Sequence, residues 1–579
     1  MEQLSGQDAS FVYFETANTP MHIGSVGIYD PSTAPGGFVR FKDILRHFAS
    51  RLDRARSFRQ KLVRVPFDLD HPYWIEDSNF DLEYHVRHVA LPAPGDWRQL
   101  CIQVARLHSR PLDLSRPLWE FTVIEGLDRI PGLPKGCFAL LAKVHHAAID
   151  GMSGVELSQA VHDLEPIAVS DVEPSTWKGD SNPPIGELMF RTWINSMRQP
   201  ARFARTLINS APGMARLGRE IAGGDVTIQN AKLAPDTLLN TKVGPHRVFD
   251  GVPFELADIR GIKSVVPGAT VNDVILSIIG GGLRQYLLGR DGLPEQSLSA
   301  MAPISVRAEG EKEALGNLVS AMIVNLGTHI ADPLARLAYI HKESSNSKAM
   351  TNAVGARTLT DYSQLVPSGL AGLGARLYTR LGLANMHAPV YNCVATNVPG
   401  PRVPLYFAGA KLVKMFGTGP VFDGMGLINT IYSYCNEIAI SFTSDREMMP
   451  DPQNYAAALK QSFEDLKAAA IGQAAAAPKP AAPKAAAPKA KAAPAAKPKT
   501  AAAAKVTAPK APAAKAPATK PAAAKPSAAK TAAPKQKAAA PPKVAEKPKA
   551  AKSAKTNATP AKPKASTKAA AKPKAGKKK

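Results

Sequence analysis

Two adjacent histidines, followed by an aspartate and a glycine, are the residues of this chain that most clearly suggest chemistry. They lie in KVHHAAIDG, residues 143–151. A neutral imidazole can accept a proton from a hydroxyl or a thiol, because its pKa lies close to neutrality. Imidazoles also bind metal ions, and histidines can simply end a strand with their nitrogens bonded to neighbours. The residues alone leave the catalytic and the purely structural interpretations open.

Strand geometry separates the two histidines. GCFALLAKVHH (136–146) has the alternating apolar pattern of a strand, which places His146 on the face of its apolar residues and His145 on the other face. Diverging imidazoles make a poor metal pair. The sequence contains no HExxH and no further histidine or cysteine at ligand spacing. We therefore expect no metal site.

The residues after the histidines favour a rigid loop. Asp150 lies four residues beyond His146, where its carboxylate can accept hydrogen bonds from backbone amides or from an arginine. Gly151 permits backbone angles and close approaches that other residues do not. The stretch GMSGV (151–155) lacks the last glycine of a G-x-S-x-G nucleophile elbow. The sequence therefore gives no argument for a nucleophilic serine at this position.

Alternating strands and helices must position these residues, which predicts an α/β protein. Strands are expected at 21–30, 85–91, 119–127, 136–146, 298–307, 319–330 and 392–401, and helices at 38–55, 153–164 and 269–288. Region 187–224 contains six arginines among apolar residues and is interrupted by Pro200 and Pro212, as expected for kinked amphipathic helices. The prediction is two lobes, 1–165 and 246–465, joined by a helical linker, 166–245.

The basic character of the chain resides in its C-terminal tail. Residues 471–579 hold 27 lysines, one acidic residue, 18 of the 50 prolines and no aromatic residue. The tail carries a formal charge of +26, whereas the whole chain carries +24. The other 470 residues therefore carry −2, and their charge gives no sign of nucleic-acid binding. Such a segment cannot bury enough apolar surface to offset the entropy of ordering, and we expect it to be disordered. It could bind DNA or anionic lipid through counterion release, or act as a solubilising spacer.

Cysteine usage and hydropathy bear on the compartment. The four cysteines have no CxxC spacing, and free buried thiols in a reducing compartment are expected. MEQLSGQDASF at the N-terminus lacks the basic and apolar regions of a signal peptide. No window of about 20 residues is apolar enough to cross a bilayer.

HHAAIDG is similar to the HHxxxDG motif of CoA-dependent acyltransferases. More closely, residues 1–465 resemble the bacterial bifunctional wax ester synthase/acyl-CoA:diacylglycerol acyltransferase family. The further stretches that carry the resemblance are LSGQDASFVYFETANTPMHIG (4–24), RPLWE (116–120), TVNDVILS (270–277), MAPISVR (301–307), GNLVSAMIVNLG (316–327) and TNVPGP (396–401). The tail lies outside it.

The resemblance implies two chloramphenicol-acetyltransferase-like lobes with one active site between them. His146 would take the proton from the hydroxyl of diacylglycerol or a long-chain alcohol as it attacks the acyl-CoA thioester, and would then protonate the thiolate. His145 and Asp150 would support the loop. Acyl-CoA is a substrate in this chemistry, and no cofactor is expected.

Other motif residues would take supporting roles. Asn272 would donate to the tetrahedral oxyanion, or with Asp273 it would only cap a helix. Pro117, Leu118 and Trp119 would brace the wall of the acyl channel. Glu15 would help to shape the acceptor side.

Long-chain lipid substrates imply contact with a membrane or lipid droplet. Region 187–224, with aromatic residues such as Phe190 and Trp193 between arginines, has the composition of an interfacial helix, and an inter-lobe helix with a solvated arginine face is the alternative. We expect a cytoplasmic protein, peripheral at the inner membrane or at lipid droplets.

A rival hypothesis is a non-catalytic lipid-granule or nucleoid tether acting through the tail, although the intact motifs argue against it. Transfer to another hydroxyl or an amine is a second rival.

Overall fold

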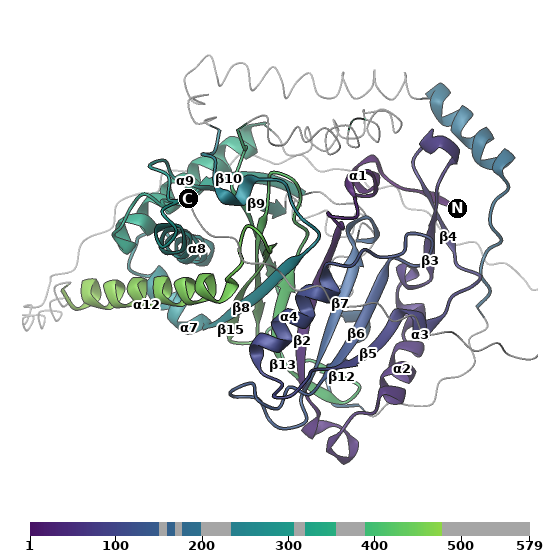
Figure 1. Cartoon of the computed structure of the whole chain (residues 1–579), viewed down its shortest axis with the longest axis horizontal. Helices are drawn as coiled ribbons and strands as arrows, with labels where there is room; N and C mark the ends of the chain where they lie inside the picture. Colours follow the sequence, from purple (N-terminus) through teal and green to yellow (C-terminus); the bar gives the residue numbers. More distant parts are fainter. Residues whose placement is uncertain are drawn as a thin grey trace, which may run out of the picture. The chain divides into compact units, whose positions relative to one another are not determined.

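Two six-stranded sheets form the framework of the computed structural model (Figure 1). The structure describes residues 1–149, 159–167, 177–198, 233–305, 319–354, 374 and 388–476. All of them fall within one compact unit, Met1–Lys484. Asp150, Gly151 and nearly all of the predicted tail lie outside the described residues.

The first sheet surrounds the strand that ends in the histidine pair. Its order is β12 (Tyr406–Phe407), β13 (Ala410–Thr418), β2 (His22–Asp30), β7 (Phe138–His145), β6 (Trp119–Glu125) and β5 (Val86–Ala90). Neighbouring strands are antiparallel, except for the parallel pair β5 and β6. Strands β12 and β13 come from the region predicted as the second lobe, so the two halves of the sequence share this sheet.

Strand β7 is buried along its whole length because both faces of the sheet are covered. On one face, Leu141 packs with Leu100 and Val104 of α4 (Trp97–His108). On the other, Leu140 belongs to a cluster with Phe48 of α2 (Phe41–Ala49). A strand covered on both sides needs a nearly continuous apolar sequence, as FALLAKV is.

The second sheet belongs to the C-terminal half. Its order is β10 (Val319–Asn325), β9 (Ser299–Ser305), β11 (Cys393–Pro399), β14 (Leu427–Tyr434), β15 (Glu437–Asp445) and β8 (Arg247–Glu255). Strand β11 runs parallel to β9 and β14, and the other pairs are antiparallel. Figure 1 shows its helices gathered beside it: α7 (Leu256–Lys263), α8 (Val271–Leu288), α9 (Pro333–Val354) and α12 (Pro452–Ala476).

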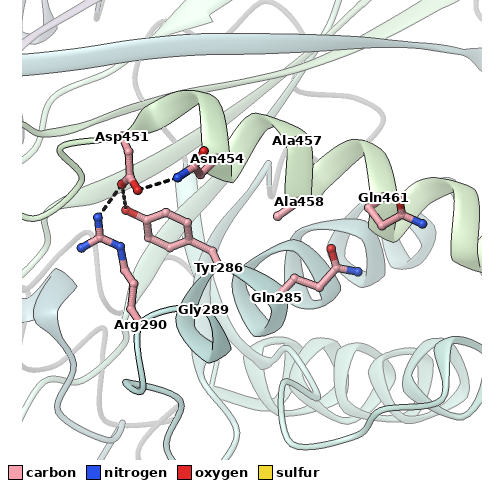
Figure 2. A pocket seen from close by; sticks show the side chains of 9 residues that line it. All are labelled: Gln285, Tyr286, Gly289, Arg290, Asp451, Asn454, Ala457, Ala458 and Gln461. Atoms are coloured by element: carbon pink, nitrogen blue, oxygen red, sulfur yellow. Dashed lines mark hydrogen bonds and ion pairs between the residues drawn. The ribbon is translucent and has the colours of Figure 1, made fainter.

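Helices α8 and α12 are joined at their ends by Asp451 (Figure 2). Its carboxylate accepts hydrogen bonds from the Tyr286 hydroxyl at 2.8 Å, from Arg290 at 2.5 Å and from Asn454 Nδ2 at 2.7 Å. Burial by itself would raise the pKa of this carboxyl. The hydrogen bonds from Tyr286, Asn454 and Arg290 outweigh burial, so the pKa lies below its usual value. The charge therefore stabilises the start of α12 against α8.

Helix α4 connects the two sheets. Besides its packing on the first sheet, Trp97 Nε1 donates to Asp250 Oδ1 on β8 at 2.7 Å. At its other end, Lys143 Nζ of β7 donates to the carbonyls of Leu107 and Arg110, at 3.1 and 3.2 Å. Lys143 is buried and also lies 3.2 Å from Glu120 Oε1. Its ammonium group thus satisfies carbonyls at the C-terminal end of α4.

A small third sheet, β1 (Glu2–Gln3), β4 (Tyr73–Glu76) and β3 (Gln60–Val63), supports a helix at residues 185–198. Leu188 of this helix packs with Val65 and Tyr73. Asn195 Nδ2 donates to Asp70 Oδ2 at 2.8 Å. This is the described part of the predicted amphipathic region 187–224.

Most predicted elements are present, with ends shifted by a few residues. All seven predicted strands and the helix at 269–288 occur. The helix predicted at 38–55 is too long: α2 ends at Ala49 and is followed by the 3-10 turns Leu52–Arg54 and Arg56–Phe58. The helix predicted at 153–164 is described only from residue 159. Helix α12 continues to Ala476, so regular structure extends beyond 471, where the disordered tail was predicted to begin.

The four cysteines are free, and three of them are buried, as predicted. In the described part of the chain, no helix is both long enough and apolar enough to cross a membrane.

Candidate active site

His146 lies where β7 ends and a 3-10 turn, His146–Ala148, begins. Its backbone N–H donates to the Met21 carbonyl at 2.8 Å, which extends the pairing with β2 by one residue. Its ring stacks on Phe11 of α1 (Gly6–Phe14), with centroids 3.8 Å apart and an interplanar angle of 14°. The backbone and the ring are therefore both held by the N-terminal segment.

His145 points the other way and is completely buried. Its Nδ1 accepts the Ala147 N–H at 3.1 Å, so the ring proton lies on Nε2. That nitrogen is 3.5 Å from Glu15 Oε2, and Glu15 Oε1 accepts the Met21 N–H at 3.2 Å. Glu15 thus links the turn after β7 to the start of β2. The sequence prediction for Glu15 did not include this contact.

Burial keeps His146 neutral. Loss of solvent, and secondly the neighbouring His145, lower the pKa of His146 to about 4. At neutral pH the imidazole is therefore in its proton-accepting form. Its Nδ1 is buried and has no hydrogen-bond partner among the described residues.

A cavity between the two sheets contains His146 in its lining. Alternate residues of β2 and β7 line one wall: Ile23, Ser25, Gly27, Leu140, Ala142 and Val144. Opposite them lie Thr396 of β11 and Thr430 and Tyr432 of β14. The site is mainly apolar with a few polar groups, which is typical of a site for a lipid chain beside a reactive group.

The PLW motif supports the end of β7. The Leu118 carbonyl accepts the His145 N–H at 2.9 Å, and the Pro117 carbonyl accepts the Trp119 N–H at the same distance. The Trp119 ring lines the cavity, and its Nε1 donates to the Phe58 carbonyl at 3.0 Å. The motif therefore holds the backbone of His145 and supplies part of the cavity wall.

The ND motif lies elsewhere. Thr270 caps α8, and its hydroxyl oxygen accepts the Asp273 N–H at 3.2 Å, while Asp273 Oδ2 accepts the Thr270 N–H at 2.8 Å. Asp273 also accepts from the Ser344 hydroxyl at 2.6 Å and lies 3.0 Å from His341 Nδ1. Burial by itself would raise the pKa of Asp273. These hydrogen bonds outweigh burial, so the pKa lies below its usual value. Asn272 is half-buried beside it, and neither residue is among those that line the cavity.

Thr430 is a site residue that sequence reasoning missed. Its hydroxyl is buried and has no hydrogen-bond partner among the described residues, although the residue lines the cavity. An unpaired buried hydroxyl is costly, so its position needs an explanation. The sequence LINTIYSY of β14 carries no signal that would have marked it.

The described residues contain no group of three or more histidine, cysteine, aspartate or glutamate side chains placed to hold a metal ion.

The fold belongs to a class of two-sheet acyltransferases. The trichothecene 15-O-acetyltransferase of Fusarium sporotrichioides shares it, with a TM-score of 0.50 at 10% identity over 80% of this chain and 95% of that chain. The wax ester synthase/diacylglycerol acyltransferase of Marinobacter aquaeolei VT8 has a TM-score of 0.57 at 28% identity, over 81% of this chain and all of that one.

The sequence comparisons name the family. The profile of the wax ester synthase/diacylglycerol acyltransferase catalytic domain matches residues 4–275, and that of the WS/DGAT C-terminal domain matches residues 315–467. A putative diacylglycerol O-acyltransferase of Mycobacterium tuberculosis is 32% identical over 468 residues, 80% of this chain and 90% of that protein. The O-acyltransferase WSD of Acinetobacter baylyi is 30% identical over 473 residues, 80% of this chain and 96% of that protein. The chain belongs to the wax ester synthase/diacylglycerol acyltransferase family and is an acyltransferase.

Proposed function

We propose that this enzyme transfers a long-chain acyl group from acyl-CoA to the hydroxyl of diacylglycerol, of a long-chain alcohol, or of both. The observation that carries the proposal is a neutral His146 in the lining of an apolar cavity between the two sheets. Family membership supports the same substrates. No cofactor is needed, because the thioester of acyl-CoA supplies the activated acyl group.

In the proposed reaction, His146 Nε2 removes the hydroxyl proton as the acceptor oxygen attacks the thioester carbon. A C–O bond forms, and the carbonyl electrons move to oxygen. When they return, the C–S bond breaks, and the protonated His146 gives its proton to the departing thiolate. Atoms and charge balance without a covalent acyl-enzyme.

The oxyanion needs a hydrogen-bond donor, and we assign that role to Thr430. Its hydroxyl has no hydrogen-bond partner among the described residues and belongs to a residue that lines the cavity with His146, whereas Asn272 is not among the lining residues. A preorganised donor in a site that excludes water stabilises developing negative charge strongly. Asn272 and Asp273 are then assigned to the start of α8, and their contribution to the reaction is indirect.

The remaining motif residues are proposed to hold His146 in place. His145 closes the turn through Ala147 and contacts Glu15, and Leu118 holds the His145 backbone. Asp150 and Gly151 are expected to stiffen the loop that follows, outside the described residues.

We further propose that the enzyme works at a lipid surface, at the inner membrane or on lipid droplets. Helix 185–198 exposes an apolar stripe: Ile185 (68%), Phe190 (60%), Trp193 (58%) and Met197 (65%). The turn between β3 and β4, which packs near this helix, exposes 92% of Phe67. Exposed aromatic and aliphatic side chains of this kind favour insertion at the headgroup boundary. The lysine-rich tail would add attraction to anionic lipid or DNA.

The acyl-transfer proposal is tested with purified protein, one long-chain acyl-CoA, and diacylglycerol, monoacylglycerol and long-chain alcohols as acceptors. Wild type should release CoA with at least one acceptor, and His146→Ala should lose nearly all of that rate. Normal transfer by His146→Ala would exclude the base assignment. An inactive wild type with a functional tail would favour the tether hypothesis, and a preference for amines or other hydroxyls would favour a different acceptor class.

A further inference from the structure

We propose that Tyr29 and His162 close the far end of the cavity and limit the length of the linear alkyl chain that it accepts. This inference rests on the proposed function, in which the cavity holds the hydrocarbon chain of one substrate. The chain belongs either to the acyl-CoA or to the alcohol, and the experiment below distinguishes the two.

The register between β2 and β7 gives the direction and length of the cavity. Ile23 pairs with Val144, Ser25 with Ala142 and Gly27 with Leu140, and all six residues line the cavity. His146 extends this series, since its N–H bonds to the Met21 carbonyl. From Met21 to Gly27 is six residues, or about 20 Å at the rise of an antiparallel strand.

The phenol of Tyr29 occupies the end of this series. A Cβ atom placed on Gly27 would lie 2.8 Å from the Tyr29 hydroxyl, so the side chain folds back over Gly27. Behind it, the Tyr29 ring stacks on Phe138, with centroids 5.3 Å apart, and contacts Phe407 at 5.4 Å. These aromatic rings prevent Tyr29 from moving away from the cavity.

His162 completes the end wall. The Tyr29 hydroxyl lies 2.7 Å from His162 Nε2, and both residues line the cavity. Burial raises the pKa of Tyr29, so the phenol keeps its proton and shares a buried hydrogen bond with His162. This polar pair lies beyond Gly27, at the end that we assign to the apolar cavity over β2 and β7.

The segment that carries His162 is fixed on both sides. The Val161 carbonyl lies 2.7 Å from His47 Nε2 of α2. Asp163 binds Arg51 at 2.6 Å and exchanges two backbone hydrogen bonds with Tyr406, at 2.8 and 2.9 Å. An end wall held at these points cannot move aside without breaking several buried contacts.

The strand segment that lines the cavity is comparable in length with one long acyl chain. A bilayer core is about 30 Å thick and holds two opposed chains, so one extended chain is about 15 Å long. A chain of this length fits within the distance of about 20 Å between Met21 and Gly27, part of which the phenol of Tyr29 occupies. A substantially longer chain would have to displace Tyr29 and separate it from His162.

Three variants test the proposal. Tyr29→Val removes the ring, and Tyr29→Phe is the matched control because it keeps the ring and loses only the hydroxyl. Ser25→Ile adds bulk midway along the groove. For each, kcat/KM is measured with a series from octanoyl- to tetracosanoyl-CoA and one fixed acceptor, and then with a series of primary alcohols and one fixed acyl-CoA.

Tyr29→Val should raise the ratio of kcat/KM for the longest over the hexadecyl-length substrate roughly tenfold or more, and Ser25→Ile should favour shorter chains by a similar factor. Tyr29→Phe should keep the wild-type preference. A shift in the acyl-CoA series assigns the groove to the acyl chain, and a shift confined to the alcohol series assigns it to the acceptor. Unchanged preferences in both series, with folded variants, would refute the chain-length limit.

Two controls keep this test separate from the proposed function. If Tyr29→Val does not fold, Ser25→Ile decides the matter alone, since an unchanged preference in that variant contradicts the proposal. If the wild type transfers no acyl group, the proposed function fails. Calorimetric binding of the same acyl-CoAs and alcohols then decides whether the chain-length limit exists.

Discussion

The neutral state of His146 leads to a quantitative prediction for the pH dependence of the reaction. Its pKa of about 4 leaves nine-tenths of the imidazole unprotonated at pH 5. A solvated histidine with a pKa of about 6.5 would be only about 3% unprotonated there. If His146 is the base, kcat/KM at pH 5 should therefore stay within about twofold of its value at pH 7.5. An ordinary histidine would lose about thirtyfold.

A substitution of Phe11 should change the pH dependence, because Phe11 helps to bury His146. Its ring covers one face of His146 at 3.8 Å, so Phe11→Ala should admit water and return the pKa towards 6.5. The variant should then lose up to about thirtyfold of its pH 7.5 activity at pH 5. Phe14→Ala is the matched control, because Phe14 lies on the same helix and is 44% exposed.

The assay should use an acyl-pantetheine thioester, because CoA carries phosphates that titrate near pH 6. Circular dichroism at pH 5 must show that each variant remains folded. The reasoning is refuted if kcat/KM of the wild type falls with an apparent pKa near 6.5, because burial would then not set the pKa of His146. It is equally refuted if Phe11→Ala and Phe14→Ala have the same profile.

Three further predictions concern other buried groups. Thr430→Val should lower kcat about a hundredfold without lowering the thermal midpoint, because it removes an unpaired hydroxyl and keeps the shape; an unchanged kcat would exclude the oxyanion role. Lys143→Met should cost about 3 kcal/mol in a denaturant titration, because it removes the buried ammonium group that pairs with Glu120 and satisfies carbonyls at the end of α4; a loss near zero would contradict this. His47 has its pKa lowered to about 4, chiefly by burial. Below pH 6.5 the unfolded state therefore binds its proton first, and His47 alone should contribute about 2 kcal/mol to the loss of stability at pH 5; His47→Gln should reduce the total loss by that amount.

Local sequence patterns were sufficient for most of the secondary structure. Alternation identified β7 and the end of the strand at the histidine pair, and the pattern of 269–288 identified the helix α8. Alternation could not show that β13 pairs with β2, because strand partners depend on chain closure over hundreds of residues. The predicted lobes therefore share a sheet in a way that the sequence pattern did not reveal.

For the candidate site too, local patterns identified some residues, and only the structure identified their contacts. The HHxxxDG motif and strand geometry singled out His146 and separated it from His145. No local pattern linked His146 to Phe11, or His145 to Glu15, because these contacts join segments about 130 residues apart. The ND motif left two roles open, oxyanion donor or helix cap, and the structure shows Asp273 capping α8 and joining it to α9.

By itself, the sequence indicated the alternating α/β character through the period of its backbone pattern, and its motifs indicated the acyltransferase class and His146 as the candidate base. Only the tertiary structure decided which groups share the cavity with His146. Burial lowers its pKa, Thr430 arrives from the second sheet, and Tyr29 meets His162 at the far end. The physical reason is that desolvation and packing are properties of the three-dimensional surroundings, to which residues distant in sequence contribute as much as neighbours do.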